Sequence, residues 1–73
     1  MKQISDKELS TLRAEYLPGT RVRLVEMDDP HAPPVGSCGT VRSVDDAGTV
    51  HVAWDAGWIL GVDYYEDTIQ KIE

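Results

Sequence analysis

The residue types that most often carry enzyme chemistry are sparse in this chain of 73 residues. Cys38 could act as a nucleophile and His51 as its general base, provided that the two side chains met and a third group oriented the imidazole. The two residues fall on different predicted strands, and His51 is expected on the solvent side of its strand. The pattern does not indicate a catalytic centre, and we expect the protein not to be an enzyme.

Two pairs of adjacent carboxylates, Asp28-Asp29 and Asp45-Asp46, are the other candidates for acid–base chemistry. Adjacent side chains on a turn point in different directions, so they are poorly placed to act together. Asp is also common in turns because its carboxylate accepts hydrogen bonds from nearby backbone amides. We therefore interpret both pairs as turn residues.

Metal-ligating residue types are present but widely spaced: His31, Cys38, His51 and several Asp. Structural zinc sites usually combine Cys or His pairs at short spacing, and no such pair occurs in the sequence. The acidic loops also lack the regular alternation of oxygen ligands that calcium loops show. We expect no metal site and no cofactor.

Aromatic residues are concentrated in one stretch of the sequence, which contains Trp54, Trp58, Tyr64 and Tyr65. Aromatic side chains lose few rotamers on binding and dominate many interfaces. A domain of this size has little room for two indoles, so we expect Trp54 in the core and Trp58 at the surface. Aromatic-lined grooves on small barrels often bind peptides.

A proline-rich loop over residues 28–37 is the second candidate for binding, and it contains Pro30, Pro33 and Pro34. Its prolines favour a stiff, extended backbone. It could be a functional loop or a rigid cover over one end of a barrel, and the sequence leaves both open. If the protein binds a peptide, we predict a surface formed by Trp58, Tyr64, Tyr65, Pro30, Pro33 and Pro34, with a basic or proline-containing ligand. Self-association through the same residues explains them equally well.

The net charge of −6, from 13 acidic and 7 basic residues, argues against binding to duplex DNA, which depends on neutralising phosphates. Solubility alone explains such a charge. Two alternatives to a protein-interaction module stay open. One is an acidic, phage-type inhibitor that blocks a basic nucleic-acid-binding surface. The other is a nucleic-acid-binding barrel that uses Arg21, Arg23 and Arg42.

Composition also bears on location. A single cysteine cannot form an intramolecular disulfide, which fits a reducing compartment. No apolar run approaches the roughly 20 residues of a membrane span, and the N-terminus lacks the apolar stretch of a signal peptide. We expect a cytoplasmic protein without membrane association.

The first element that would position these residues is a helix over residues 5–15. Ser5 and Glu8 have the spacing of a capping box. Leu9, Leu12 and Tyr16 recur at helical spacing and form a narrow apolar stripe. We expect this helix to cover an open face or edge of a barrel.

Five short strands are predicted after the helix, over residues 20–27, 39–44, 49–54, 58–62 and 68–72. Val41 and Val44 share one side of their strand only if a bulge lies near residues 42–43. Gly48 and Gly57 end Asp-led turns and should have positive φ. Residues 63–67 should form a single helical turn. Five strands with that turn before the last predict one domain, 1–73, with an SH3-like barrel over residues 20–72. The pattern does not separate this fold from an OB-like barrel, although the very short elements favour the SH3-like one.

The sequence resembles the domain of unknown function 4314 family, small proteins of bacteria, phages and mobile elements. The resemblance covers almost the whole chain and rests on Pro18-Gly19-Thr20-Arg21-Val22, Met27-x-Asp29-Pro30-x-Ala32-Pro33-Pro34-x-Gly36, Gly39-Thr40-Val41, Val44-Asp45-Asp46-x-Gly48 and His51-Val52-x-Trp54-Asp55-x-Gly57. It implies a small stand-alone or appended domain, without an assigned activity or site. Trp58 departs from the small polar residue that the family typically has there, so a binding mode that uses Trp58 would be particular to this protein.

Overall fold

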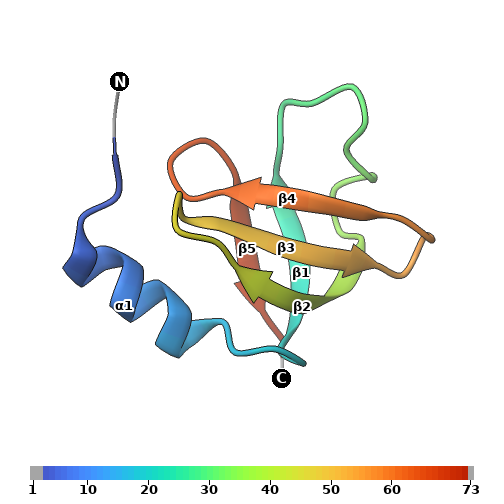
Figure 1. Ribbon diagram of the computed structural model, residues 1–73. Helices are drawn as coiled ribbons and strands as arrows, with labels where there is room; N and C mark the ends of the chain where they lie inside the picture. The colour runs from blue at the N-terminus through green and yellow to red at the C-terminus, as the bar shows by residue number, and fades with distance from the viewer. Residues whose placement is uncertain (1–2, 73) are drawn as a thin grey trace.

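The computed structural model describes residues 3–72 as a short helix followed by five antiparallel strands (Figure 1). The elements are α1 (Asp6–Glu15), β1 (Arg21–Glu26), β2 (Cys38–Val44), β3 (Thr49–Trp54), β4 (Ile59–Asp63) and β5 (Thr68–Lys71). The strands form one sheet in the order β4-β3-β2-β1-β5. The predicted mainly β fold with an N-terminal helix is confirmed. Within residues 3–72 no strand ladder joins the edge strands β4 and β5, so the sheet is not closed and a barrel is not confirmed.

The capping box predicted for α1 is present. The Ser5 hydroxyl accepts a hydrogen bond from the Glu8 amide at 3.1 Å, and the Glu8 carboxylate accepts one from the Ser5 amide at 3.0 Å. These bonds satisfy two backbone donors that the first helical turn would otherwise leave unpaired. The apolar stripe is narrow, since Leu12 is the one residue of α1 that is fully buried. The helix therefore depends on a single core side chain and on polar contacts to hold its place.

The first two strands alternate as the sequence predicts. Val22 and Leu24 of β1 point into the core. In β2 the pairing with β3 shifts between Val41 and Ser43, which is the predicted bulge. The extra residue allows both Val41 and Val44 to face the core, although they are three positions apart.

Strand β3 is the most regular, and its last inward residue is Trp54, which is 3% exposed. The indole N–H donates to the Leu60 carbonyl at 3.2 Å, so the buried polar atom is paired. The ring lies against the backbone of β2 at Gly39, where an added Cβ would come within 2.9 Å of the indole. Gly39 therefore leaves the space that Trp54 fills.

The two hairpin turns have the predicted backbone conformation. Gly48 has φ of +86° and Gly57 has φ of +120°, which favour glycine over residues with a side chain. In the first turn the Asp45 carboxylate accepts hydrogen bonds from the amides of Ala47 and Thr49, both at 3.0 Å. The three-residue turn after Trp54 is closed by a 2.9 Å hydrogen bond from the Trp54 amide to the Trp58 carbonyl.

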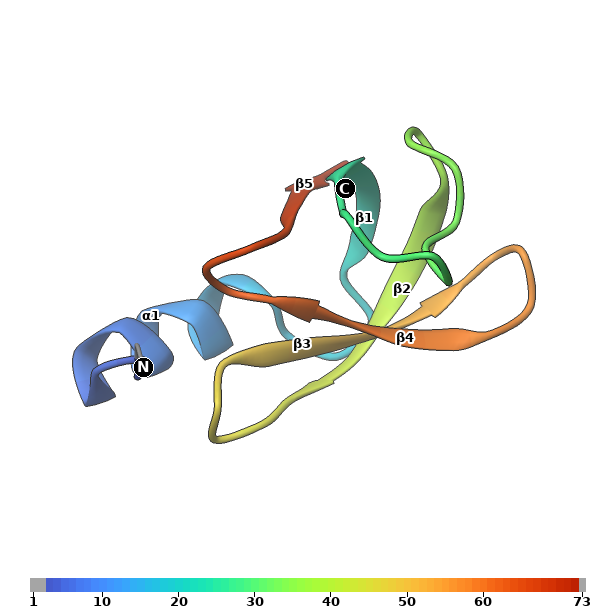
Figure 2. The ribbon, with the colours of Figure 1, turned by 90° about the horizontal axis from the view of Figure 1, so that it is seen from above.

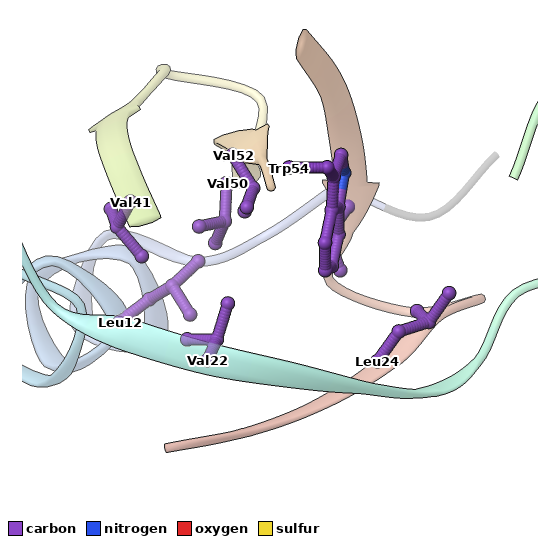
Figure 3. Close-up of a cluster of buried hydrophobic side chains, with 8 residues drawn as sticks. Leu12, Val22, Leu24, Val41, Val50, Val52 and Trp54 are labelled. Atoms are coloured by element: carbon purple, nitrogen blue, oxygen red, sulfur yellow. The ribbon is translucent and has the colours of Figure 1, made fainter. Parts of the chain in front are cut away.

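Among the described residues, 3–72, the core is a single cluster of eight buried apolar side chains: Leu12, Val22, Leu24, Val41, Val50, Val52, Trp54 and Val62. Leu12 extends from α1 towards Val22, Val41 and Val50, whereas Leu24 and Trp54 lie towards the other end of the cluster (Figure 3). Ile69, predicted as core, is partly buried and packs against the cluster. Seen from above, α1 lies beside one end of the sheet (Figure 2), so the helix covers the end at which β4 turns into β5.

Candidate binding groove

A groove of about 440 Å³ lies between α1, the end of the sheet and the turn that joins β4 to β5. Its floor consists of apolar side chains that also belong to the core or pack against it: Leu12, Val50, Val62 and Ile69. Three tyrosines line it as well: Tyr16, Tyr64 and Tyr65. Asp63, Asp67 and Thr68 complete the lining. An apolar floor with a few polar groups is typical of ligand sites in proteins.

Two of the tyrosines form a pair that contacts the helix. The rings of Tyr64 and Tyr65 meet edge to face, with their centroids 4.9 Å apart and their planes at 88°. Both hydroxyls donate to the Glu8 carboxylate of α1 at 3.4 Å, and the Tyr65 hydroxyl also lies 3.3 Å from the Gln3 carbonyl. Partial desolvation of the phenol, followed by the nearby Glu8 charge, raises the pKa of Tyr65. The tyrosine pair therefore links the β4–β5 turn to α1.

The turn that carries the tyrosine pair is held by its two aspartates. The Asp67 amide donates to the Asp63 carbonyl at 3.1 Å, which is the spacing of one α-helical turn and agrees with the prediction for residues 63–67. The Asp63 amide in turn donates to the Asp67 carboxylate at 2.9 Å. These reciprocal bonds fix the direction in which Tyr64 and Tyr65 project.

Tyr16, at the C-terminal end of α1, already contacts a cation of the chain itself. The Lys71 ammonium nitrogen lies 6.0 Å from the centroid of the Tyr16 ring and 3.3 Å from a carboxylate oxygen of Glu15. A cation at this distance is attracted by the negative face of the ring. Burial of the phenol, followed by the Glu15 charge, raises the pKa of Tyr16, and Lys71 opposes that effect.

A second hollow of about 220 Å³ adjoins the groove along α1 and shares Leu12, Tyr16 and Tyr64 with it. It adds Glu8, Thr11 and Glu15. The described residues that line the two hollows therefore include four carboxylates, Glu8, Glu15, Asp63 and Asp67, but no Lys, Arg or His. Hydrogen bonds from the Ser5 backbone and side chain lower the pKa of Glu8, which keeps it charged.

The structure separates the residues that the sequence grouped into one binding surface. Tyr64 and Tyr65 line the groove. Trp58 is 42% exposed, as expected of the second indole, but it precedes β4 whereas Tyr64 follows it. Five residues of strand span about 16 Å, so the two aromatics lie at opposite ends of β4.

The proline-rich loop between β1 and β2 lies away from α1 (Figure 1). None of its prolines lines the groove. Pro33 is buried, whereas Pro30 and Pro34 are exposed. The base of the loop is held by bonds of 2.8 Å from the Gly36 amide to the Leu24 carbonyl and from the Leu24 amide to the Ser37 carbonyl. The buried Pro33 fits the interpretation of a rigid cover, and binding by this loop stays a prediction.

Tyr16 and Asp63 were not predicted from the sequence to belong to the site. Tyr16 appeared only as the last member of the apolar stripe of the helix and Asp63 only as part of a turn, whereas Asp67 was expected to flank the predicted surface. The available signal was that the stripe ends in an amphipathic side chain, which can pack on the sheet and still reach a ligand.

The residues considered for catalysis have other partners. The Cys38 thiol lies 3.8 Å from the Gly36 carbonyl, and His51 Nε2 lies 2.9 Å from Asp45. Hydrogen bonds from the His51 ring, followed by the Thr49 amide, lower the pKa of Asp45. In residues 3–72 no three His, Cys, Asp or Glu side chains gather as metal ligands would.

Arg21, considered for nucleic-acid binding, is engaged by an acidic neighbour. Its guanidinium donates to both carboxylate oxygens of Asp55, at 2.8 and 2.6 Å, and to the Thr40 hydroxyl at 2.9 Å. These bonds lower the pKa of Asp55, so the pair stays ionised. Arg23 and Arg42 are exposed. Pairing with Asp55 offsets the positive charge that Arg21 would otherwise present to a nucleic acid.

The family model described as Domain of unknown function (DUF4314) matches residues 5–72, which include α1 and all five strands. The chain belongs to this family. Comparison with curated proteins and with solved structures found no match. Every described residue that lines the groove lies within the matched range, so the groove is part of the DUF4314 domain. Among residues 3–72, no helix has the length and apolar character needed to cross a membrane.

Proposed function

We propose that the protein is a non-enzymatic protein-interaction module built on an SH3-like barrel that is open between its edge strands. The strand order supports this architecture, because β5 pairs with β1 and the single turn at Asp63–Asp67 brings the chain from β4 to β5. The one cysteine and the family resemblance fit a cytoplasmic module of a bacterium, phage or mobile element.

The groove beside α1 carries the proposal. Its apolar floor is continuous with the core, so the site has a fixed base, and its tyrosines present amphipathic surface to a partner. Such aromatic side chains supply contact area at low entropic cost. The open form of the hollow suits a peptide segment or a protruding loop of another protein.

Site-specific photo-crosslinking in the native host tests this function. A benzoylphenylalanine is placed at position 64 in the groove or, as a matched control, at position 58 at the other end of β4. Both positions hold exposed aromatics, so neither replacement removes a buried side chain. We expect discrete protein adducts from position 64 that excess wild-type protein prevents, and that Tyr64→Leu protein prevents only at an about two- to fivefold higher concentration. Adducts from position 58 alone, or none from position 64, would refute the proposal.

The acidic lining favours one second candidate, the inhibitor that blocks a basic nucleic-acid-binding surface. The described residues that line the groove and the adjoining hollow include four carboxylates and no basic side chain, which would complement a basic surface. The inhibitor predicts that the crosslinked partner binds nucleic acid and that the bound module prevents this. A partner that still binds nucleic acid in the complex would reject the inhibitor, and the interaction module would be the remaining candidate.

A further inference from the structure

We propose that the groove binds lysine side chains of an extended basic segment in the protein partner. The ammonium groups lie against the tyrosine rings and the surrounding carboxylates, and the methylene stems lie on the apolar floor. This inference rests on the proposed function and gives the chemistry of its partner.

Charge complementarity is the first argument. Four carboxylates line the groove and the adjoining hollow, and the described lining residues include no basic side chain. Potentials at protein interfaces are complementary, and like charges brought together cost several kcal/mol. An acidic or phosphorylated segment would meet this repulsion, whereas a lysine would be attracted.

The chain already binds one of its own lysines in this way. Lys71 lies over the Tyr16 ring and beside the Glu15 carboxylate, so an aromatic face and a carboxylate together hold an ammonium group. Tyr64 likewise lies in the turn between Asp63 and Asp67, and all three residues line the same groove as Tyr16. The local chemistry that holds Lys71 is thus continued along the groove.

The floor provides the third argument. A lysine side chain has a long apolar stem and a charged tip, and it buries the stem along apolar surface while the tip stays near water. Leu12, Val62 and Ile69 offer such a surface, and none of the four lining carboxylates is buried. Apolar segments without charge would use the floor but not the acidic lining.

The proposal is tested by titrating the full chain with a short Lys-Ala repeat peptide. Binding is followed by the change in amide chemical shifts in NMR spectra of the protein. The matched control is the same peptide with every lysine acetylated, which removes the charge and keeps the stem. We expect saturable shifts at Tyr16, Tyr64 and Thr68, and at least tenfold weaker binding of the acetylated peptide. Equal binding of the two peptides would overturn the lysine assignment.

Matched variants distinguish the effect of the Tyr64 ring from that of its hydroxyl. They also distinguish the effect of a charge at the groove from that of an equal charge elsewhere on the protein. Tyr64→Leu should weaken binding about two- to fivefold because an exposed cation–π contact is lost, whereas Tyr64→Phe should not. Asp67→Asn should weaken binding more than Glu66→Gln, which removes an equal charge outside the lining. Lys71→Met should strengthen binding more than Lys7→Met, because it also frees the Tyr16 ring. Equal effects within each pair would contradict the proposal.

The two proposals can fail separately. Adducts from position 64 combined with equal binding of both peptides would retain the interaction module and reject the lysine ligand. Adducts from position 64 without any peptide binding would have the same meaning. The absence of adducts from position 64 would reject the function, and the ligand assignment that rests on it would fall with it.

Discussion

Lys71 of β5 holds its ammonium nitrogen 6.0 Å from the centre of the Tyr16 ring, at the C-terminal end of α1. Near the other end of the helix, the hydroxyls of Tyr64 and Tyr65 donate to Glu8. Between these polar contacts Leu12 enters the core. The helix is thus attached to β5 and to the turn between β4 and β5, and it forms one wall of the groove.

We expect Leu12→Ala to lower the free energy of unfolding by about 2–5 kcal/mol, because it removes a buried side chain and leaves a cavity. This is a large part of the roughly 4–11 kcal/mol expected for a domain of this size. Urea denaturation measures the effect. Leu17→Ala, at a leucine that is 59% exposed, is the matched control and should change stability by less than about 0.5 kcal/mol. Similar losses for both variants would show that α1 is not anchored by Leu12.

Gly39→Ala should destabilise the protein by about 1–3 kcal/mol or more, because the added methyl group overpacks the core. Its Cβ would lie 2.6 Å from a Val52 methyl group and 2.9 Å from both the Ala53 carbonyl oxygen and the Trp54 ring. Thermal unfolding followed by tryptophan fluorescence reports both stability and indole environment. Ser43→Ala, at an exposed position of the same strand, is the control. An unchanged melting temperature for Gly39→Ala would argue against this approach of β2 to Trp54.

Local sequence patterns predicted those elements that local chemistry determines. The capping box located the start of α1, and the spacing of Val41 and Val44 located the bulge in β2. The groove could not be predicted in this way, because it depends on the docking of α1 against a turn more than fifty residues later in the chain. Tyr64 and Trp58 looked like one surface because they are close in sequence, but β4 places them at opposite ends. Whether the sheet closes into a barrel could not be predicted either, because the alternation of apolar and polar residues does not specify whether the two edge strands pair.

Asp45 should contribute to the pH dependence of stability. Its pKa is lowered from the ordinary value of 3.8, first by the His51 hydrogen bond. The folded state therefore favours the charged form, so the contribution is complete above about pH 4 and is lost as the pH falls through the lowered pKa. Because the pair is exposed and screened, the contribution should be below about 1 kcal/mol.

Urea denaturation of wild type and Asp45→Asn from pH 7 to pH 2 measures this contribution. We expect the variant to be less stable at neutral pH and the difference to shrink at the acid end. Asp28→Asn, on the exposed β1–β2 loop, controls for the loss of a negative charge. A difference that stays constant over the whole range would exclude the linkage.

The protein should not bind duplex DNA at about 150 mM salt, because its net charge of −6 opposes approach to phosphates and Asp55 pairs with Arg21. Fluorescence anisotropy with a labelled duplex measures the affinity. Submicromolar binding would contradict the expectation. Loss of that binding in Arg23→Ala and Arg42→Ala would then assign it to these two exposed arginines.

The central claim is that a lysine side chain lies against the tyrosines of the groove. Intermolecular nuclear Overhauser effects between the Lys-Ala peptide and the labelled protein measure that contact directly. We predict cross-peaks from the lysine methylene protons to the ring protons of Tyr16 and Tyr64 and to the side chain of Leu12 or Ile69. Cross-peaks to the indole of Trp58, with none to Tyr16 or Tyr64, would contradict the claim.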